Sequence, residues 1–406
     1  MTTDPAFLRG MTSSRRDALR LLGLTGAGLG LAACGVKGQK AAPPKQNDVQ
    51  KYWAGKTKHG HVNFANWPLY MDKARTPLKA FTKATGVTVT YREVISEMPQ
   101  WFGKIAPQLQ AGQSIGYDLM VVTNGVEFTK LKELGYLVPL DHSRLPNFAK
   151  YAAEIYRKES FDPGNVFSVP YQTGLTGIAY DPAKTGREIT SIQDLWDPAF
   201  KGKVGMMSDP QEIGNFGMFA IGVDPEKSTP ADWKRAAARL QEQKSKGIVR
   251  KYYEQDYIDA LTRGDVWLTM AWSGDIFQQN LSEKSNLKFV IPKEGATLWT
   301  DNLMIPKTAE NPVDALMLMD FFYLPDTAAK LAESVNYVTP VPAAKQAIEA
   351  DAAKATGADQ KSLQQIAGSP LVFPSDADYA KLRHYRTLTT AEEKEYNTTF
   401  QHITAG

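Results

Sequence analysis

The sequence predicts an α/β protein with mostly parallel sheets. Short apolar runs alternate with stretches of helical periodicity along most of the chain, as in strands joined by helices. Of the 406 residues, 43% are hydrophobic, which is enough to fill one or two complete cores. The single cysteine leaves no intramolecular disulfide, so stability must come from packing. Neither GxGxxG nor GxxxxGK occurs, so the sequence offers no glycine-rich phosphate-binding loop.

The first predicted elements are a strand, a helix and two further strands. Residues 61–67 (HVNFANW) and 87–91 (VTVTY) have the composition of strands, and the second alternates as a half-buried strand does. The helix expected between them, 77–85, carries its apolar residues on one side and is followed by a glycine suited to its C-terminal cap. Residues 118–122 (DLMVV) predict a buried strand, because the run after the acid is continuously apolar.

The rest of the chain continues this alternation without an internal repeat. Further strands are expected at 167–171, 177–180, 204–207, 268–272, 287–291 and 303–305. Helices among them include 230–244 and 312–322, the second with Asn311 as its N-cap and a proline in its first turn.

The N-terminal segment has the features of an export signal. Residues 21–33 are uncharged and apolar, but they are fewer than the roughly 20 residues that a bilayer span needs. A twin-arginine pair, Arg15 and Arg16, precedes them, and Cys34 follows two small residues. We therefore expect residues 1–33 to be a lipoprotein signal peptide of the twin-arginine (Tat) type, with Cys34 as the lipidated residue. A buried N-terminal helix is the alternative, and the general secretory route stays open.

Charge and composition describe the rest of the chain. Removing residues 1–33 takes away four of the 47 basic and two of the 44 acidic residues, which leaves a formal charge of +1. Such a balance gives no attraction to nucleic acid. Residues 34–58 are polar and lysine-rich, and we expect a flexible tether. The domain would then lie on the outer face of the cell membrane, in the periplasm if the envelope has two membranes.

Three tryptophans lie at or just after the expected ends of strands. They are Trp67, Trp272 and Trp299. In open α/β sheets, ligands bind beyond the carboxyl ends of the strands, so these rings are candidates for contact with a ligand. Taken singly, each of them is about as well explained as a core residue.

Acidic residues accompany these tryptophans. Asp275 and Asp301 follow Trp272 and Trp299 closely, and Asp209 and Glu212 follow the expected strand 204–207. Each acid alone is well explained as a turn residue or a helix cap. Carboxylates that converge without a cation repel one another, whereas an alkyl ammonium ion uses both carboxylates and aromatic faces. The combination therefore predicts a site for an organic cation.

Several motifs spread along residues 60–402 resemble those of a known family. The chain is similar to the spermidine/putrescine-binding proteins, which are the extracellular solute-binding subunits of polyamine ABC importers. The motifs are NWPLY at 66–70, FTKATGVTV at 81–89, YDL at 117–119, VPY at 169–171 with Gly174, SIQDLWDPAFKG at 191–202, WSGD at 272–275, PKEG at 292–295 and YVTP at 337–340. Any one of them is weak, but their order and spacing together are specific.

This resemblance implies a two-lobed type II periplasmic-binding-protein fold, with each lobe a mostly parallel sheet flanked by helices. The ligand would lie in the cleft between the lobes, and closure would bury it. We expect one lobe to comprise residues 59–174 and 300–345, and the other to comprise 175–299 and 346–406. The implied partners are a polyamine and a membrane permease. We expect a monomer that needs no cofactor or metal and binds no nucleic acid.

The resemblance also implies which residues contact the ligand. The aromatic residues that would pack on its methylene groups are Trp67, Tyr70, Trp272, Trp299 and Tyr337. The carboxylates that would hold its amines are Glu212, Asp275 and Asp301, with Asp209 as a further match. Thr123 stands where the family often has a serine or threonine, although the aromatic residues that commonly follow are absent here.

Arg386 is a departure from the family, because it falls near the position of a glutamine that contacts the ligand. It either pairs with a nearby acid, points to solvent, or grips a carboxylate or phosphonate at one end of the ligand. The last case predicts a zwitterionic ligand, similar to an amino acid or an aminophosphonate. A secreted enzyme on the same scaffold is a weaker alternative, because the five histidines form no recognisable catalytic or metal motif beyond His59-Gly60-His61.

Overall fold

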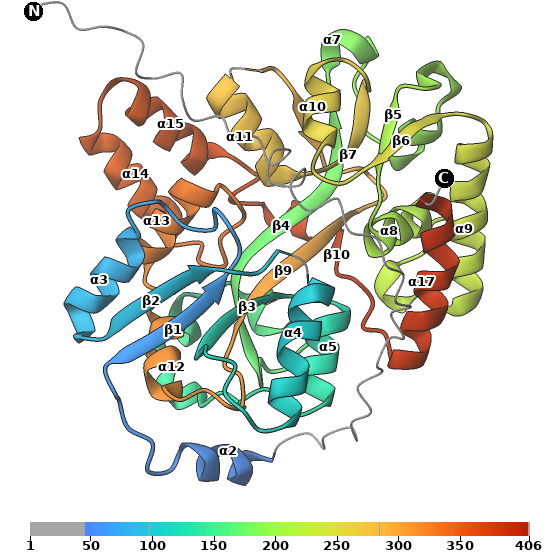
Figure 1. Ribbon diagram of the computed structural model, residues 1–406. Helices are drawn as coiled ribbons and strands as arrows, with labels where there is room; N and C mark the ends of the chain where they lie inside the picture. Colours follow the sequence, from blue (N-terminus) through green and yellow to red (C-terminus); the bar gives the residue numbers. More distant parts are fainter. Residues whose placement is uncertain (1–44, 97, 284, 405–406) are drawn as a thin grey trace, which may run out of the picture. The chain divides into compact units, whose positions relative to one another are not determined.

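The computed structural model describes residues 45–96, 98–283 and 285–404, which belong to one compact unit (Figure 1). The expected signal peptide at 1–33, Cys34 and the first part of the expected tether lie outside the described residues. In none of the described helices is the apolar stretch long enough to cross a bilayer.

Part of the expected tether is a helix. Helix α2 spans Gln46–Trp53, and Trp53 is only 2% exposed. Its indole N–H donates to the carbonyl of Pro139 at 2.8 Å, and Val49 and Tyr52 pack beside it on the hydrophobic core. The prediction of a flexible tether was therefore wrong for this segment, because its apolar residues are adjacent on one helical face and bury together.

One mixed sheet runs through the part of the chain that the structure describes. Its strands follow the order β2-β1-β3-β9-β4-β7-β5-β6, with β10 paired to β9 and β8 paired to β4. The strands are β1 His61–Asn66, β2 Thr88–Glu93, β3 Leu119–Thr123, β4 Ser168–Tyr180, β5 Val204–Met207, β6 Val249–Tyr253, β7 Leu268–Trp272, β8 Lys288–Val290, β9 Ala296–Met304 and β10 Leu382–Arg383.

Two long central strands join the two ends of this sheet. Strands β2, β1 and β3 are parallel to one another at one end, as are β7, β5 and β6 at the other. Between them lie β4 and β9, which are antiparallel to each other and buried along their whole length (Figure 1). The result is two parallel-sheet lobes joined by a pair of crossing strands.

Helices cover both lobes. The first lobe carries α3 Thr76–Thr85, α4 Met98–Gln110, α5 Val126–Glu133, α6 Pro146–Tyr151, α12 Pro312–Phe321, α13 Pro325–Val335, α14 Ala344–Lys354 and α15 Gly357–Gly368. The second carries α7 Pro182–Thr185, α8 Pro210–Ala220, α9 Pro230–Ser245, α10 Tyr257–Thr262, α11 Ser273–Glu283 and α17 Thr390–Thr404, and a single turn, α16 Asp376–Tyr379, precedes β10.

Each lobe has an extensive hydrophobic core. The first includes Phe64 and Leu303, and the second includes Phe216 and Leu268. Ile348 of α14 and Ile366 of α15 belong to the first core. Assigning residues 346–406 as a whole to the second lobe was therefore wrong for these two helices, because their apolar sides pack on α13 and its neighbours rather than on β5 and β7.

The strands and helices expected from apolar patterns are found with small shifts of their ends, but the central strands are longer than expected. The runs expected at 167–171 and 177–180 are parts of the single strand β4, and the run at 303–305 is the end of β9. Trp299 therefore lies inside a strand instead of at its end. Asn311 does occupy the N-cap position of α12, but its side chain makes no cap bond and donates to Asp118 at 3.1 Å instead.

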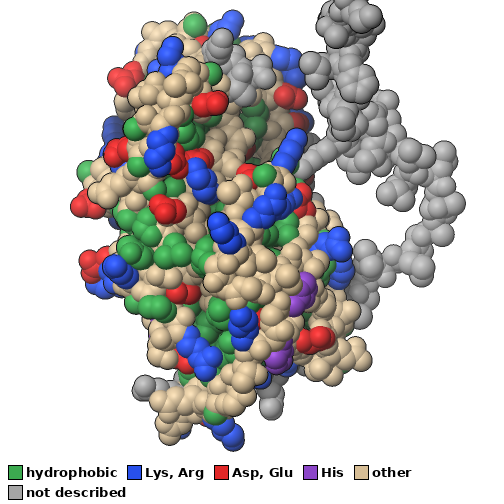
Figure 2. Space-filling view, turned by 90° about the vertical axis from the view of Figure 1, so that its left-hand side faces the viewer, with side chains coloured by type: hydrophobic (Ala, Val, Ile, Leu, Met, Phe, Trp, Pro, Cys, Tyr) green, Lys and Arg blue, Asp and Glu red, His purple; other side chains and the backbone are tan. Residues whose placement is uncertain are grey.

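The surface carries charges of both signs. Figure 2 shows the face formed by the left-hand side of Figure 1, where basic and acidic side chains are interspersed with apolar ones. This mixture accords with the small net charge of the sequence, +3.

Candidate ligand-binding site

The central strands align the candidate residues on one face of the sheet. Side chains alternate along a strand, so Thr297, Trp299 and Asp301 of β9 point to the same side. The register places Trp299 opposite Gly174 of β4. A Cβ atom on Gly174 would lie 2.0 Å from the indole ring of Trp299, so only glycine lets the ring lie this close to β4.

Asp301 forms the first carboxylate centre. It is 5% exposed and accepts hydrogen bonds from the hydroxyls of Tyr70 at 2.6 Å and Thr123 at 2.5 Å. Thr123 is its register partner on β3, which explains why these side chains meet. Burial raises the pKa of Asp301 to about 6, although the two hydroxyl donors oppose this shift.

Glu212 forms the second centre and is 2% exposed. Its Oε1 accepts from Thr176 at 2.7 Å, from the Tyr385 hydroxyl at 2.8 Å and from the Trp272 indole N–H at 3.1 Å. Its Oε2 is buried and has no partner in the structure. Burial, and then the charge of Asp209, raise the pKa of Glu212 to about 7. A buried carboxylate oxygen without a hydrogen-bond partner is suited to accept a hydrogen bond from a cation.

Asp209 explains why Glu212 lies where it does. It is the N-cap of α8, and its Oδ1 accepts from the main-chain N–H groups of Gln211 at 2.8 Å and Glu212 at 3.0 Å. The cap begins the helix directly after β5, so that Glu212 falls in the first turn and faces the sheet. Asp209 itself is exposed, and its predicted contact with the ligand stays a prediction.

Asp275 forms the third centre, in the first turn of α11, which continues directly from β7. The hydroxyl of Tyr257 donates to its Oδ2 at 2.5 Å. Burial raises the pKa of Asp275, while this hydrogen bond lowers it. All three carboxylates thus have neutral hydrogen-bond donors, and each accepts a hydrogen bond from a tyrosine hydroxyl.

Tyr337 connects the centres. Its ring lies 5.1 Å from that of Trp299 and 5.9 Å from that of Tyr70, both edge to face. Burial and the nearby charges of Asp275 and Asp301 raise its pKa well above the ordinary value. The Tyr337 hydroxyl is therefore close enough to a carboxylate of each lobe to feel both charges.

Two predicted residues lie less closely associated with these centres. Trp67 directly follows β1, is half-buried and packs against the first core. Arg386 donates to Glu392 at 2.8 Å, which is the first of the alternatives open for it. The ligand contacts of both residues stay predictions.

Sequence reasoning missed three hydroxyl donors, those of Thr176, Tyr257 and Tyr385. Thr176 lies in the polar middle of β4, and Tyr257 lies in a short helix distant in sequence from Asp275. Neither residue lies in a sequence pattern that would have indicated its hydrogen bond to a carboxylate. Tyr385 is adjacent to Arg386, so the unusual run HYR at 384–386 marked its position without indicating its role.

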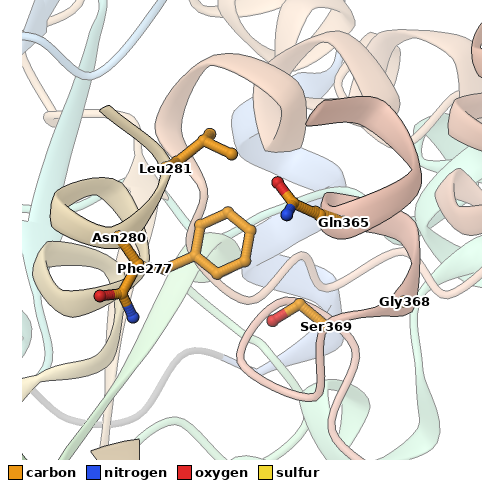
Figure 3. Close-up of a pocket in the computed structure, with 6 residues that line it drawn as sticks. All are labelled: Phe277, Asn280, Leu281, Gln365, Gly368 and Ser369. Carbon is orange, nitrogen blue, oxygen red and sulfur yellow. The ribbon is translucent and has the colours of Figure 1, made fainter. Parts of the chain in front are cut away.

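No group of three or more histidines, cysteines or acids within the described ranges is arranged to hold a metal ion. The rings of His59 and His61 instead lie 3.0 Å from Asn311 and 2.8 Å from Thr88. A cavity of about 360 Å³ lies apart from the three carboxylates, between α11 and α15 (Figure 3). Phe277 points across it toward Gln365, and its lining carries no charged side chain.

Fold and site together define a two-lobed binding protein with a polar, aromatic-lined centre at the crossing strands. The chain belongs to the bacterial extracellular solute-binding proteins, since the sequence pattern of that family matches residues 78–358. The spermidine/putrescine-binding periplasmic protein 1 of Haemophilus influenzae is 32% identical over 310 residues, which are 76% of this chain and 79% of that protein. The spermidine/putrescine-binding periplasmic protein of Escherichia coli is 28% identical over 344 residues, 84% of this chain and 91% of that one.

A solved structure shares the fold. The spermidine/putrescine ABC transporter substrate-binding protein PotD of Streptococcus pneumoniae matches with a TM-score of 0.72 at 24% identity, over 84% of this chain and 98% of that one. This likeness confirms the predicted type II periplasmic-binding-protein fold.

Proposed function

We propose that this protein is the substrate-binding subunit of an ABC importer and captures a polyamine, putrescine or spermidine. The observation that carries the proposal is the set of three carboxylates, Asp301, Asp275 and Glu212, which are held only by neutral donors and lie among aromatic rings. The names of the similar proteins of Haemophilus influenzae and Escherichia coli support this ligand class.

The chemistry of the site matches an organic polycation. An ammonium group offers only donors, and Oε2 of Glu212 is a buried acceptor without a partner. Each aromatic face under an alkyl ammonium contributes about 0.5–2 kcal/mol. A neutral ligand would leave the two buried carboxylates, Glu212 and Asp301, uncompensated when ionised, at a cost of several kcal/mol each.

The spacing of the centres suits a chain with amines at both ends. Thr176, which binds Glu212, pairs with Thr297 of β9. Thr297 and Asp301 are four residues apart, about 13 Å along the strand. At about 1.2 Å per bond in an extended chain, the outer nitrogens of putrescine and spermidine are separated by about 6 and 11 Å. Hydrogen bonds of about 2.8 Å at each end extend these spans to about 12 and 17 Å, and the distance along the strand lies between the two values.

The remaining steps follow from capture. We propose that the bound polyamine passes to a membrane permease without a bond-making step, so that the protein acts as a receptor and not as an enzyme. We further propose that the chain is exported, is anchored through a lipid on Cys34 and works as a monomer. Anchoring would keep the receptor close to its permease.

Calorimetric titration of the domain with putrescine, spermidine and a panel of amino acids tests the ligand class. We expect micromolar or tighter binding of a polyamine, and Asp301→Asn should weaken it at least about tenfold. Arg386→Gln is the matched charge control and should leave polyamine affinity within about twofold, since Arg386 pairs with Glu392. Absence of heat with every polyamine at millimolar concentration would refute the proposal. Amino-acid binding lost in Arg386→Gln would favour the zwitterionic ligand instead.

A further inference from the structure

One buried tyrosine outside the predicted set contacts two of the predicted ligand-binding residues. Tyr257, at the start of α10, is 0% exposed. Its hydroxyl donates to Asp275 Oδ2 at 2.5 Å and accepts the main-chain N–H of Trp272 at 3.0 Å. Its ring also packs edge to face against that of Trp272, at 6.1 Å.

The main-chain bond fixes the direction of the hydroxyl. A peptide N–H can only donate, so the oxygen of Tyr257 must accept from Trp272. The single hydrogen of the hydroxyl is then free only for Asp275. This donor stabilises the ionised carboxylate more than the protonated acid. Oδ1 of Asp275 takes no part in this bond.

The contact reaches beyond Asp275. The indole N–H of Trp272 donates to Glu212 at 3.1 Å. By holding the main chain of Trp272 and packing on its ring, Tyr257 also fixes the side chain that contacts the second carboxylate centre. Within the part of the chain that the structure describes, the titratable groups that interact with Asp275 are Tyr257 from α10 and Tyr337 from the segment after α13.

We infer that Tyr257 is a positioning residue that keeps Asp275 ionised and aimed at an ammonium group of the ligand. The inference rests on the proposed polyamine site and explains what keeps one of its carboxylates ionised and oriented. It predicts that removal of a single hydroxyl, which is fully buried and bonded to Asp275, changes the pH dependence of binding.

A double-mutant cycle tests the inference. In Tyr257→Phe we expect putrescine affinity to fall about tenfold at pH 7.5 and further at pH 6, because Asp275 loses its donor. On an Asp275→Asn background the same change should cost no more than about twofold. Tyr323→Phe is the control, since it removes an equally buried hydroxyl that donates to the main-chain carbonyl of Pro170. Equal losses with and without Asp275, at both pH values, would overturn the inference.

A ligand-free measurement separates this inference from the proposed function. The carboxyl carbon of Asp275, labelled with ¹³C and assigned by its loss in Asp275→Asn, reports its titration directly. We expect its midpoint to rise by about one pH unit in Tyr257→Phe and to stay unchanged in Tyr323→Phe. An unchanged midpoint in Tyr257→Phe refutes the positioning role even if polyamines bind. A raised midpoint supports the role even if the wild-type protein binds no polyamine.

Discussion

At the residue scale, the site is a set of carboxylates kept in an unfavourable environment. Glu212 and Asp301 are almost fully buried, and burial raises their pKa values to about 7 and about 6. Ordinary acids ionise near pH 4. At pH 5–6 these two carboxyl groups therefore hold more protons in the ligand-free folded protein than they do in the unfolded chain. A bound cation would displace these protons.

Stability and affinity should consequently depend on pH in opposite directions. Because the folded pKa of Glu212 is raised, the folded state binds more protons between pH 4.5 and 7, so the ligand-free protein loses stability as pH rises through this window. Polyamine affinity should instead rise over the same window. Each carboxyl group should contribute about a tenfold increase per pH unit as long as the pH is below its pKa. Thermal unfolding and titration at pH 5, 6, 7 and 8 measure both.

The control is Glu212→Gln, which keeps the acceptor oxygen and removes the charge. At pH 7.5 we expect this variant to be more stable than the wild type by about 2–3 kcal/mol without ligand and to bind putrescine at least about tenfold more weakly. A wild-type protein that gains stability from pH 5 to pH 7.5 would contradict the raised pKa values.

At the element scale, β4 and β9 do most to position the site, and they are also where sequence reasoning was least successful. Strands with continuous apolar residues, such as β3 and β5, were predicted to within a residue or two of their ends. The middle of β4 and of β9 is buried but polar, with Thr173, Thr176, Thr300 and Asp301. Apolar patterning cannot reveal such strands, because their burial follows from the tertiary pairing of the two strands and not from local hydrophobicity.

The contact between these strands makes a prediction about Gly174. Its α-hydrogen faces Trp299, so Gly174→Ala must displace the indole ring. We expect polyamine affinity to fall at least about tenfold and the unfolding free energy to fall by about 1–3 kcal/mol. Gly103→Ala in α4 is the control, because a Cβ there meets no atom within 4 Å and the position is helical. Equal affinities of the two variants would show that the position of Trp299 is unimportant.

At the scale of the whole molecule, residues far apart in sequence complete each centre. Asp301 is bound by Tyr70 and Thr123, and Glu212 by residues 36, 60 and 173 positions away. Glu212 and Asp275 could be proposed from local patterns because they follow the recognisable strands β5 and β7, whereas Trp299 and Asp301 lie inside β9, whose polar middle apolar patterning does not reveal. Of the hydroxyl partners, Tyr70 and Thr123 were among the predicted residues. Thr176, Tyr257 and Tyr385 were not, because their pairing follows from the tertiary fold and leaves no local pattern.

Contacts between the lobes should therefore influence affinity even where they lie away from the carboxylates. Lys130 of α5, in the first lobe, pairs with Glu393 of α17, in the second, at 2.9 Å, and both side chains are less than one-third exposed. A bond that exists only when the lobes are together stabilises the closed form, and ligand affinity depends on the population of that form. Lys130→Met should thus weaken polyamine binding by about two- to fivefold in low salt and by less in 1 M salt.

Lys234→Met is the control. It removes an ion pair with Glu395 of the same helix, α17, at 3.5 Å, but both partners of this pair belong to the second lobe. Titrations with a polyamine at both salt concentrations should therefore show weaker binding for Lys130→Met than for Lys234→Met. Equal affinities of the two variants would contradict a role for the Lys130–Glu393 pair in closure.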